Sequence, residues 1–181
     1  MRELECKLKL EEPEGVVARL AALGAVYHGE VHERNRVFDR AGELAARQEL
    51  LRLRVTDDHA WGILTHKRPA PEKHYKCRVE TETRVENAEN TRIILESLGF
   101  EQDWFYEKKR QSWVLEGCEL VIDRLPQLGY YLEIEAPDEP TIDRLLAELG
   151  LDRRQNLNTN YRQIWREHCE RTGRDFKDWR F

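Results

Sequence analysis

The chain opens with the stretch RELECKLKL, residues 2–10, in which apolar and charged side chains alternate. Alternation with a period of two is typical of a β-strand with one buried face. The polar face of this strand is unusual because it presents Glu3, Glu5 and Lys7 in succession. Two carboxylates ~6.6 Å apart along a strand suit a hard divalent cation, and a lysine one step on suits an anion held by that cation. Taken alone, the stretch fits a solvated strand face better than a metal site.

Composition narrows the class of protein. The 181 residues are long enough for one domain with a sizeable core, and the net charge of −5 does not favour a nucleic-acid-binding protein. Four scattered cysteines without a CxxC pair indicate reduced thiols in a cytoplasmic protein. No apolar run approaches the ~20 residues of a membrane span, and the charged N-terminus is not typical of a signal peptide. We therefore expect one soluble domain over residues 1–181, in the cytoplasm and without membrane association.

Hydrophobic periodicity and turn residues predict an α+β fold. The expected strands span residues 2–10, 31–39, 51–55, 60–67, 75–83, 103–113, 119–124 and 130–136. The expected helices span residues 13–23, 88–98, 141–149 and 161–169, with a helical turn or loop at 41–48, a turn at Asp57–Asp58 and a loop at 68–71. Residues 170–181 show no clear pattern. Short turns favour antiparallel pairing, and eight strands are enough to close a barrel around a small ligand, with helices packed outside.

The polar faces of the expected strands carry paired charges. Arg52 and Arg54 share one face, while Glu133 and Glu135 share another. An open sheet with a solvated face is one interpretation, but the segregation of paired cations from paired carboxylates favours a lined cavity. Arginine and lysine bind phosphate oxygens, whereas carboxylates tolerate phosphate only when Mg²⁺ or Mn²⁺ bridges them. The pattern therefore indicates a metal-dependent enzyme acting on a polyphosphate, with no Walker A loop or dinucleotide glycine fingerprint.

The residues at 3–7, ELECK, resemble the ExExK signature of the CYTH superfamily, which is named for class IV adenylyl cyclases and thiamine triphosphatases. Its companion motifs follow in order as LRLR at 51–54, LTHKRP at 64–69, RVE at 78–80, EKKR at 107–110 and LGYYLEIE at 128–135. The resemblance covers about residues 1–166. It implies a closed eight-stranded antiparallel tunnel that holds a triphosphate and two divalent ions, Mg²⁺ or Mn²⁺.

The resemblance also implies roles for individual residues. The implied metal ligands are Glu3, Glu5, Glu80, Asp123, Glu133 and Glu135. The implied triphosphate ligands are Lys7, Arg52, Arg54, Lys67, Arg78, Lys108 and Arg110. Catalysis is expected from Glu3, Glu5, Lys7, Arg52, Arg54, Lys108 and Arg110. Glu82 is an additional candidate that could instead pair with a neighbouring lysine, and His66 is expected to point away from the cavity.

The spacing from Tyr106 to Glu135 and the NYRQ stretch at 160–163 resemble the class IV adenylyl cyclase branch most. This branch implies conversion of ATP into cyclic AMP and pyrophosphate. A triphosphatase acting on tripolyphosphate, thiamine triphosphate or a nucleoside triphosphate is almost equally compatible, and a non-catalytic polyphosphate-binding protein is a third reading. We expect a small triphosphate as the partner, no nucleic acid, and a monomer or homodimer. We further expect Glu133 and Glu135 to be strained by neighbouring carboxylates.

Overall fold

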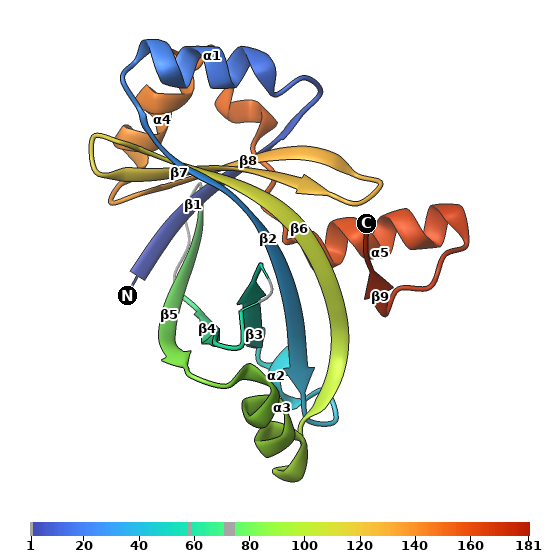
Figure 1. The fold of residues 1–181 in the computed structure, drawn as a ribbon. Helices are drawn as coiled ribbons and strands as arrows, with labels where there is room; N and C mark the ends of the chain where they lie inside the picture. Colours follow the sequence, from blue (N-terminus) through green and yellow to red (C-terminus); the bar gives the residue numbers. More distant parts are fainter. Residues whose placement is uncertain (1, 58, 71–74) are drawn as a thin grey trace.

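The structure, a computed structural model, describes residues 2–57, 59–70 and 75–181 (Figure 1). The side chains of Arg2 and Glu3 lie outside this description, as do Asp58 of the expected turn and Pro71 of the expected loop. In the described part of the chain, the strands are β1 (Arg2–Leu10), β2 (Val26–Asp39), β3 (Leu50–Thr56), β4 (Gly62–Pro69), β5 (Lys76–Val85), β6 (Glu101–Leu115), β7 (Cys118–Leu125), β8 (Gly129–Ala136) and β9 (Asp178–Trp179). The helices are α1 (Glu14–Ala22), α2 (Glu43–Ala46), α3 (Ala88–Ser97), α4 (Glu139–Glu148) and α5 (Tyr161–Thr172), with a 3-10 turn at Arg153–Gln155.

Eight of these strands form a closed antiparallel barrel, which confirms the predicted fold class. Their order is β2-β3-β4-β5-β1-β8-β7-β6, and β6 pairs again with β2 to close the ring. Strand β1, which carries the opening stretch, lies between β5 and β8. The charged faces of its neighbours are therefore brought around one interior.

Strand β2 is longer than the sequence predicted because its pairing with β6 starts at Val26, opposite Val114, rather than at Val31. The register shifts between Tyr27 and Gly29, where Gly29 has a φ of 106°, a left-handed conformation that glycine adopts without strain. This irregularity hides the start of the strand from an argument based on strict alternation.

Helices α1 and α4 cover one part of the apolar outer face of the barrel, and helix α3 covers another (Figure 1). Helices α1 and α4 pack on β1, β7 and β8, where Leu8, Leu20 and Leu145 belong to one buried cluster. Helix α3 packs on β2 and β3 through a second cluster that includes Phe38 and Leu95. Among the described residues, no helix is both long and apolar enough to cross a membrane.

The C-terminal tail, which the sequence left without an interpretation, is part of the fold. Strand β9 pairs in parallel with β6 at Phe105 and Tyr106. Trp179 has no exposed surface, stacks on Trp165 with 4.5 Å between ring centroids, and donates its indole N–H to the Pro126 carbonyl at 2.8 Å. The tail therefore completes a third, aromatic cluster between the barrel and α5.

We expect Trp179→Ala to lower the free energy of unfolding by about 3–5 kcal/mol, because it removes a fully buried indole and leaves a cavity. Urea unfolding measures the change. Phe181→Ala is the matched control, since that ring lies two residues further on and is 51% exposed; it should cost under about 1 kcal/mol. Equal losses in the two variants would show that the tail is not integrated into the core.

Candidate functional site

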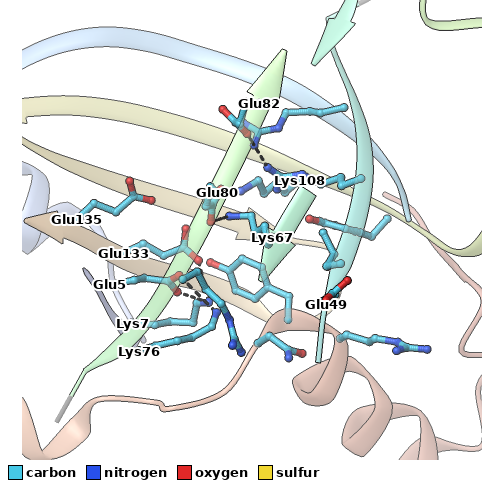
Figure 2. Close-up of a pocket in the computed structure, with 18 of the residues that line it drawn as sticks. Glu5, Lys7, Glu49, Lys67, Lys76, Glu80, Glu82, Lys108, Glu133 and Glu135 are labelled. Atoms are coloured by element: carbon cyan, nitrogen blue, oxygen red, sulfur yellow. Dashed lines mark hydrogen bonds and ion pairs between the residues drawn. The ribbon is translucent and has the colours of Figure 1, made fainter. Parts of the chain in front are cut away.

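A cavity of about 440 Å³ lies inside the barrel, and charged side chains make up most of its lining (Figure 2). The predicted site residues found in the lining are Glu5, Lys7, Arg52, Arg54, Lys67, Arg78, Glu80, Lys108, Arg110, Glu133 and Glu135. Other lining residues include Lys76, Glu82, Glu119, Tyr106 and Tyr161. Asp123 does not reach the cavity surface, and the Glu3 side chain lies outside the described residues. The lined-cavity interpretation therefore describes the barrel better than a solvated sheet face.

Lys7 forms ion pairs with carboxylates on two neighbouring strands, Glu5 on β1 and Glu133 on β8. Its ammonium contacts Glu5 Oε1 at 2.8 Å and Glu133 Oε1 at 2.9 Å, because Lys7 on β1 lies directly opposite Glu133 on β8. Lys76 on β5 contacts the other Glu5 oxygen at 3.4 Å. Burial alone would raise the pKa of Glu5, but Lys7 and Lys76 outweigh burial and lower it to about 2. Glu5 is therefore ionised at any physiological pH.

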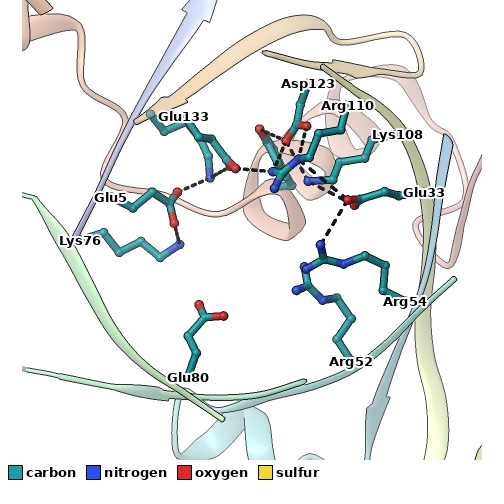
Figure 3. Close-up of polar contacts among 12 residues, drawn as sticks. Glu5, Glu33, Arg52, Arg54, Lys76, Glu80, Lys108, Arg110, Asp123 and Glu133 are labelled. Atoms are coloured by element: carbon teal, nitrogen blue, oxygen red, sulfur yellow. Dashed lines mark hydrogen bonds and ion pairs between the residues drawn. The ribbon is translucent and has the colours of Figure 1, made fainter. Parts of the chain in front are cut away.

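Asp123 on β7, the strand next to β8, contacts cations of the following strand β6 (Figure 3). It has no exposed surface and accepts hydrogen bonds from Lys108 Nζ at 2.8 Å, from Arg110 Nε and Nη2 at 2.7 Å each, and from the Tyr161 hydroxyl at 3.0 Å. Both carboxylate oxygens are thus occupied by donors. This geometry fixes the orientation of Lys108 and Arg110, and the metal-binding role of Asp123 that the resemblance implies stays a prediction.

Glu33 on β2 belongs to the same network, and the sequence analysis missed it. Its carboxylate contacts Arg54 Nη1 at 3.2 Å and Lys108 Nζ at 3.4 Å, and it is 2% exposed. Burial would raise the pKa of Glu33, but Lys108, Arg54 and Arg110 outweigh burial and lower it strongly. Alternation could not identify this residue, because both faces of residues 32–36 are polar.

Strands β4 and β5 contribute further charged side chains to the cavity lining. Lys67 forms an ion pair with Glu80, so Glu80 faces the cavity as predicted. In the described part of the chain, Glu82 accepts a hydrogen bond from the Thr65 hydroxyl at 2.5 Å, lies 3.6 Å from Arg52 and forms no ion pair with a lysine. His66 points away from this lining and contacts Glu49 Oε2 at 3.1 Å, in agreement with its parity.

Glu135 is a lining carboxylate whose negative charge is not balanced by a contacting cation among the described residues. The expected strain from like charges falls on Glu135 and not on Glu133, which contacts both Lys7 and Arg110. Burial raises the pKa of Glu135 to about 7, and the negative charges of Glu133 and Glu119 add to the effect. Among the described residues, Glu135 forms no ion pair. The local field therefore favours an additional positive charge beside this carboxylate.

A divalent cation suits the lining carboxylates of β1 and β8. Glu5, Glu133 and Glu135 offer only carboxylate oxygens, the ligands that hard divalent ions prefer. In the described residues, no group of three or more acidic, histidine or cysteine side chains is already arranged around a common metal position. Lys7 and Arg110 occupy oxygens of Glu5 and Glu133 instead. A bound metal would therefore have to displace cations that the side chains now contact.

The raised pKa of Glu135 makes stability depend on pH. Because the folded pKa of about 7 lies above the ordinary value of 4.5, the folded protein binds this proton more tightly than the unfolded chain does. The free energy of unfolding should therefore fall as the pH rises from 4.5 through 7. We expect Glu135→Gln to raise it by about 1–3 kcal/mol at pH 8 and to change it little at pH 4.5.

Urea unfolding at both pH values tests this expectation. Glu101→Gln serves as the control, because Glu101 is an exposed carboxylate at the start of β6 and should change stability by no more than about 0.5 kcal/mol at either pH. An identical pH dependence in the wild type and the Glu135→Gln variant would contradict a raised pKa of Glu135.

Comparisons with known proteins agree with this architecture. Residues 1–159 match the family model of the CYTH domain. A Methanocaldococcus jannaschii protein that is provisionally named as an adenylate cyclase is 30% identical over 152 residues, which cover 82% of this chain and 86% of that protein. The structure of a Pyrococcus horikoshii protein superposes with a TM-score of 0.79 at 20% identity, covering 92% of this chain and 99% of its own.

A structure from Hippeastrum superposes with a TM-score of 0.62 at 19% identity, covering 96% of this chain and 97% of its own. That protein is described as an adenylyl cyclase candidate with a dominant triphosphatase activity. At these identities, the two structural likenesses show the fold alone. The match to the family model over most of the chain, together with the relative at 30% identity, shows more: the protein belongs to the CYTH family.

Proposed function

We propose that the protein is a divalent-metal-dependent enzyme that binds a triphosphate inside the barrel, with cyclisation of ATP to cyclic AMP and pyrophosphate as the favoured reaction. The observation that carries this proposal is the cavity lining, in which cations and carboxylates of several strands face one another at contact distance. The name of the Methanocaldococcus jannaschii relative supports the cyclase over other reactions.

Charge balance supports the use of two metal ions. Among the described side chains, which do not include Glu3, nine cations and seven carboxylates line the cavity, and Glu33 and Asp123 add two carboxylates in contact with these cations. These charges cancel. Fully ionised ATP brings about four negative charges, so two divalent cations would restore neutrality in a buried space where excess charge is costly.

The position of each lining residue suggests whether it would bind the metal or the phosphates. Glu5, Glu133 and Glu135 on β1 and β8 would hold the metal, which when bound would screen the phosphate oxygens from these carboxylates and polarise the reacting phosphorus. Arg52 and Arg54 on β3 and Lys108 and Arg110 on β6 would bind phosphate oxygens. Asp123 and Glu33 would keep the β6 cations oriented.

Hydrolysis of a triphosphate is the second candidate reaction. One observation favours it: the Hippeastrum protein of the same fold is described as having a dominant triphosphatase activity. A water molecule in place of the ribose hydroxyl would use the same cations and carboxylates.

One assay tests both reactions and the need for metal. The purified protein is incubated with ATP and, separately, with tripolyphosphate, each with Mg²⁺ or Mn²⁺ and each with excess chelator. We expect cyclic AMP and pyrophosphate from ATP, and no product in the chelator samples. Inorganic phosphate from either substrate supports the triphosphatase instead. Activity that survives exhaustive chelation would contradict the metal requirement, and no product from either substrate would contradict an enzymatic role.

Arg52 tests the phosphate-binding wall. Arg52 is 6% exposed and lies within the cavity lining, so Arg52→Ala should lower turnover by about 10²–10³-fold through loss of one preorganised charge contact. Arg84→Ala is the matched control, because that side chain is 57% exposed and does not line the cavity. Steady-state kinetics should show Arg84→Ala within twofold of the wild type. A loss below threefold for Arg52→Ala would remove that wall from the proposed site.

A further inference from the structure

The segment after the 3-10 turn, at Asn156 and Leu157, forms hydrogen bonds with the backbone of Lys7. Asn156 Oδ1 accepts a hydrogen bond from the Lys7 backbone N–H at 3.0 Å, and the Leu157 N–H donates to the Lys7 carbonyl at 2.7 Å. The pairing of β1 with β5 extends only to Glu5 in the described residues, so this segment takes the next position along the edge of β1. Lys7 is therefore held from outside the barrel as well as within it.

Helix α5 begins immediately afterwards and brings Tyr161 under the same lysine. The side chain of Asn160 caps the helix by accepting from the Gln163 N–H at 2.9 Å, which fixes Tyr161 in the first turn. The Lys7 ammonium lies 4.1 Å from the centroid of the Tyr161 ring, and the Lys108 ammonium lies 5.7 Å from it. Both distances are within the range of a cation–π interaction.

The Tyr161 hydroxyl completes a second connection. It donates to Asp123 Oδ2 at 3.0 Å, and Asp123 in turn accepts from Lys108 and Arg110. Tyr161 is 7% exposed, and burial together with Asp123 and Glu133 raises its pKa well above the ordinary value, so the hydroxyl keeps its proton. Tyr161 thus contacts Lys7 of β1 through its ring and, through its hydroxyl, Asp123, which binds the cations of β6.

We propose that Tyr161 is a positioning residue. It keeps Lys7 in place for the triphosphate when Glu5 and Glu133 bind the metal instead of Lys7; this proposal rests on the proposed function. In the present arrangement those two carboxylates bind Lys7 at 2.8 and 2.9 Å. A metal that takes their oxygens removes these two contacts. The aromatic ring is not a ligand for a hard cation, so its attraction for the ammonium remains when the carboxylates are exchanged.

Binding measurements on two variants separate the ring from the hydroxyl. Calorimetric titration with tripolyphosphate and Mg²⁺, carried out well below the melting temperature, gives the affinity. Tyr161→Leu removes the ring, and we expect it to weaken binding by about tenfold. Tyr161→Phe keeps the ring, and we expect binding within about threefold of the wild type. Tyr75→Phe is the matched control, since it removes a buried tyrosine–aspartate hydrogen bond, to Asp143, outside the cavity; its affinity should be unchanged.

Nuclear magnetic resonance on protein with ¹³C-labelled lysine tests the position of Lys7 without a ligand. The ε-methylene signal of Lys7, assigned with Lys7→Arg, should show a ring-current shift in the wild type and in Tyr161→Phe and lose it in Tyr161→Leu. The proposal is overturned if Tyr161→Leu keeps the shift, if it binds tripolyphosphate as tightly as the wild type, or if Tyr161→Phe loses as much affinity as Tyr161→Leu.

The two measurements also distinguish this proposal from the proposed function. If the wild type binds no tripolyphosphate, the proposed function fails, and with it the role of Tyr161 toward a triphosphate. The ring-current result still decides whether Tyr161 positions Lys7. If the wild type binds and turns over a triphosphate while the Leu variant behaves as the wild type, only the role of Tyr161 fails.

Discussion

The contact between Asp123 and Arg110 is the interaction on which the charged interior depends. A fully buried carboxylate is tolerated only when donors satisfy both of its oxygens, and Arg110 provides two of them. From Arg110 the contacts continue through Glu133 to Lys7 and Glu5. Charges on β7, β6, β8 and β1 therefore form one network, and each strand is placed by pairing with its neighbours. The closed barrel is what makes such a density of buried charge possible.

This network explains why the interior is preorganised without being uniformly strained. Glu5, Glu33 and Glu133 each have cations at contact distance, and their pKa values are lowered despite burial. The uncompensated charge is left on Glu135, whose pKa is raised. A metal ion beside Glu135 would relieve that charge, so binding would gain most at the position that costs the apo protein most. An interior in which most carboxylates are paired with cations and one is not is expected where a site loses stability in exchange for ligand affinity.

Much of the fold could be predicted from the sequence, because it follows local rules. Alternation identified β1 and β3, and the glycines after the first three long helices marked their ends. The lining at Arg52 and Glu133 followed from parity alone. Glu33 could not be found this way, because its strand is polar on both faces. The family resemblance implies a metal-binding role for Asp123, but a motif does not show that Arg110 and Lys108 donate hydrogen bonds to its oxygens.

The tail shows why the remainder needed three dimensions. Strand β6 has 15 residues, and β7 pairs with it only from Lys109 onward, which leaves the first part of that edge without β7. Exposed strand edges invite aggregation, and β9 covers this one at Phe105 and Tyr106. The cover is only two residues long, so its stability has to come from Trp179, which stacks on Trp165 of α5. The same packing that protects the edge therefore also holds the helix whose first residue is Tyr161, under Lys7. A requirement of the sheet and a requirement of the site are met by one stretch of chain, which short motifs and alternation cannot reveal.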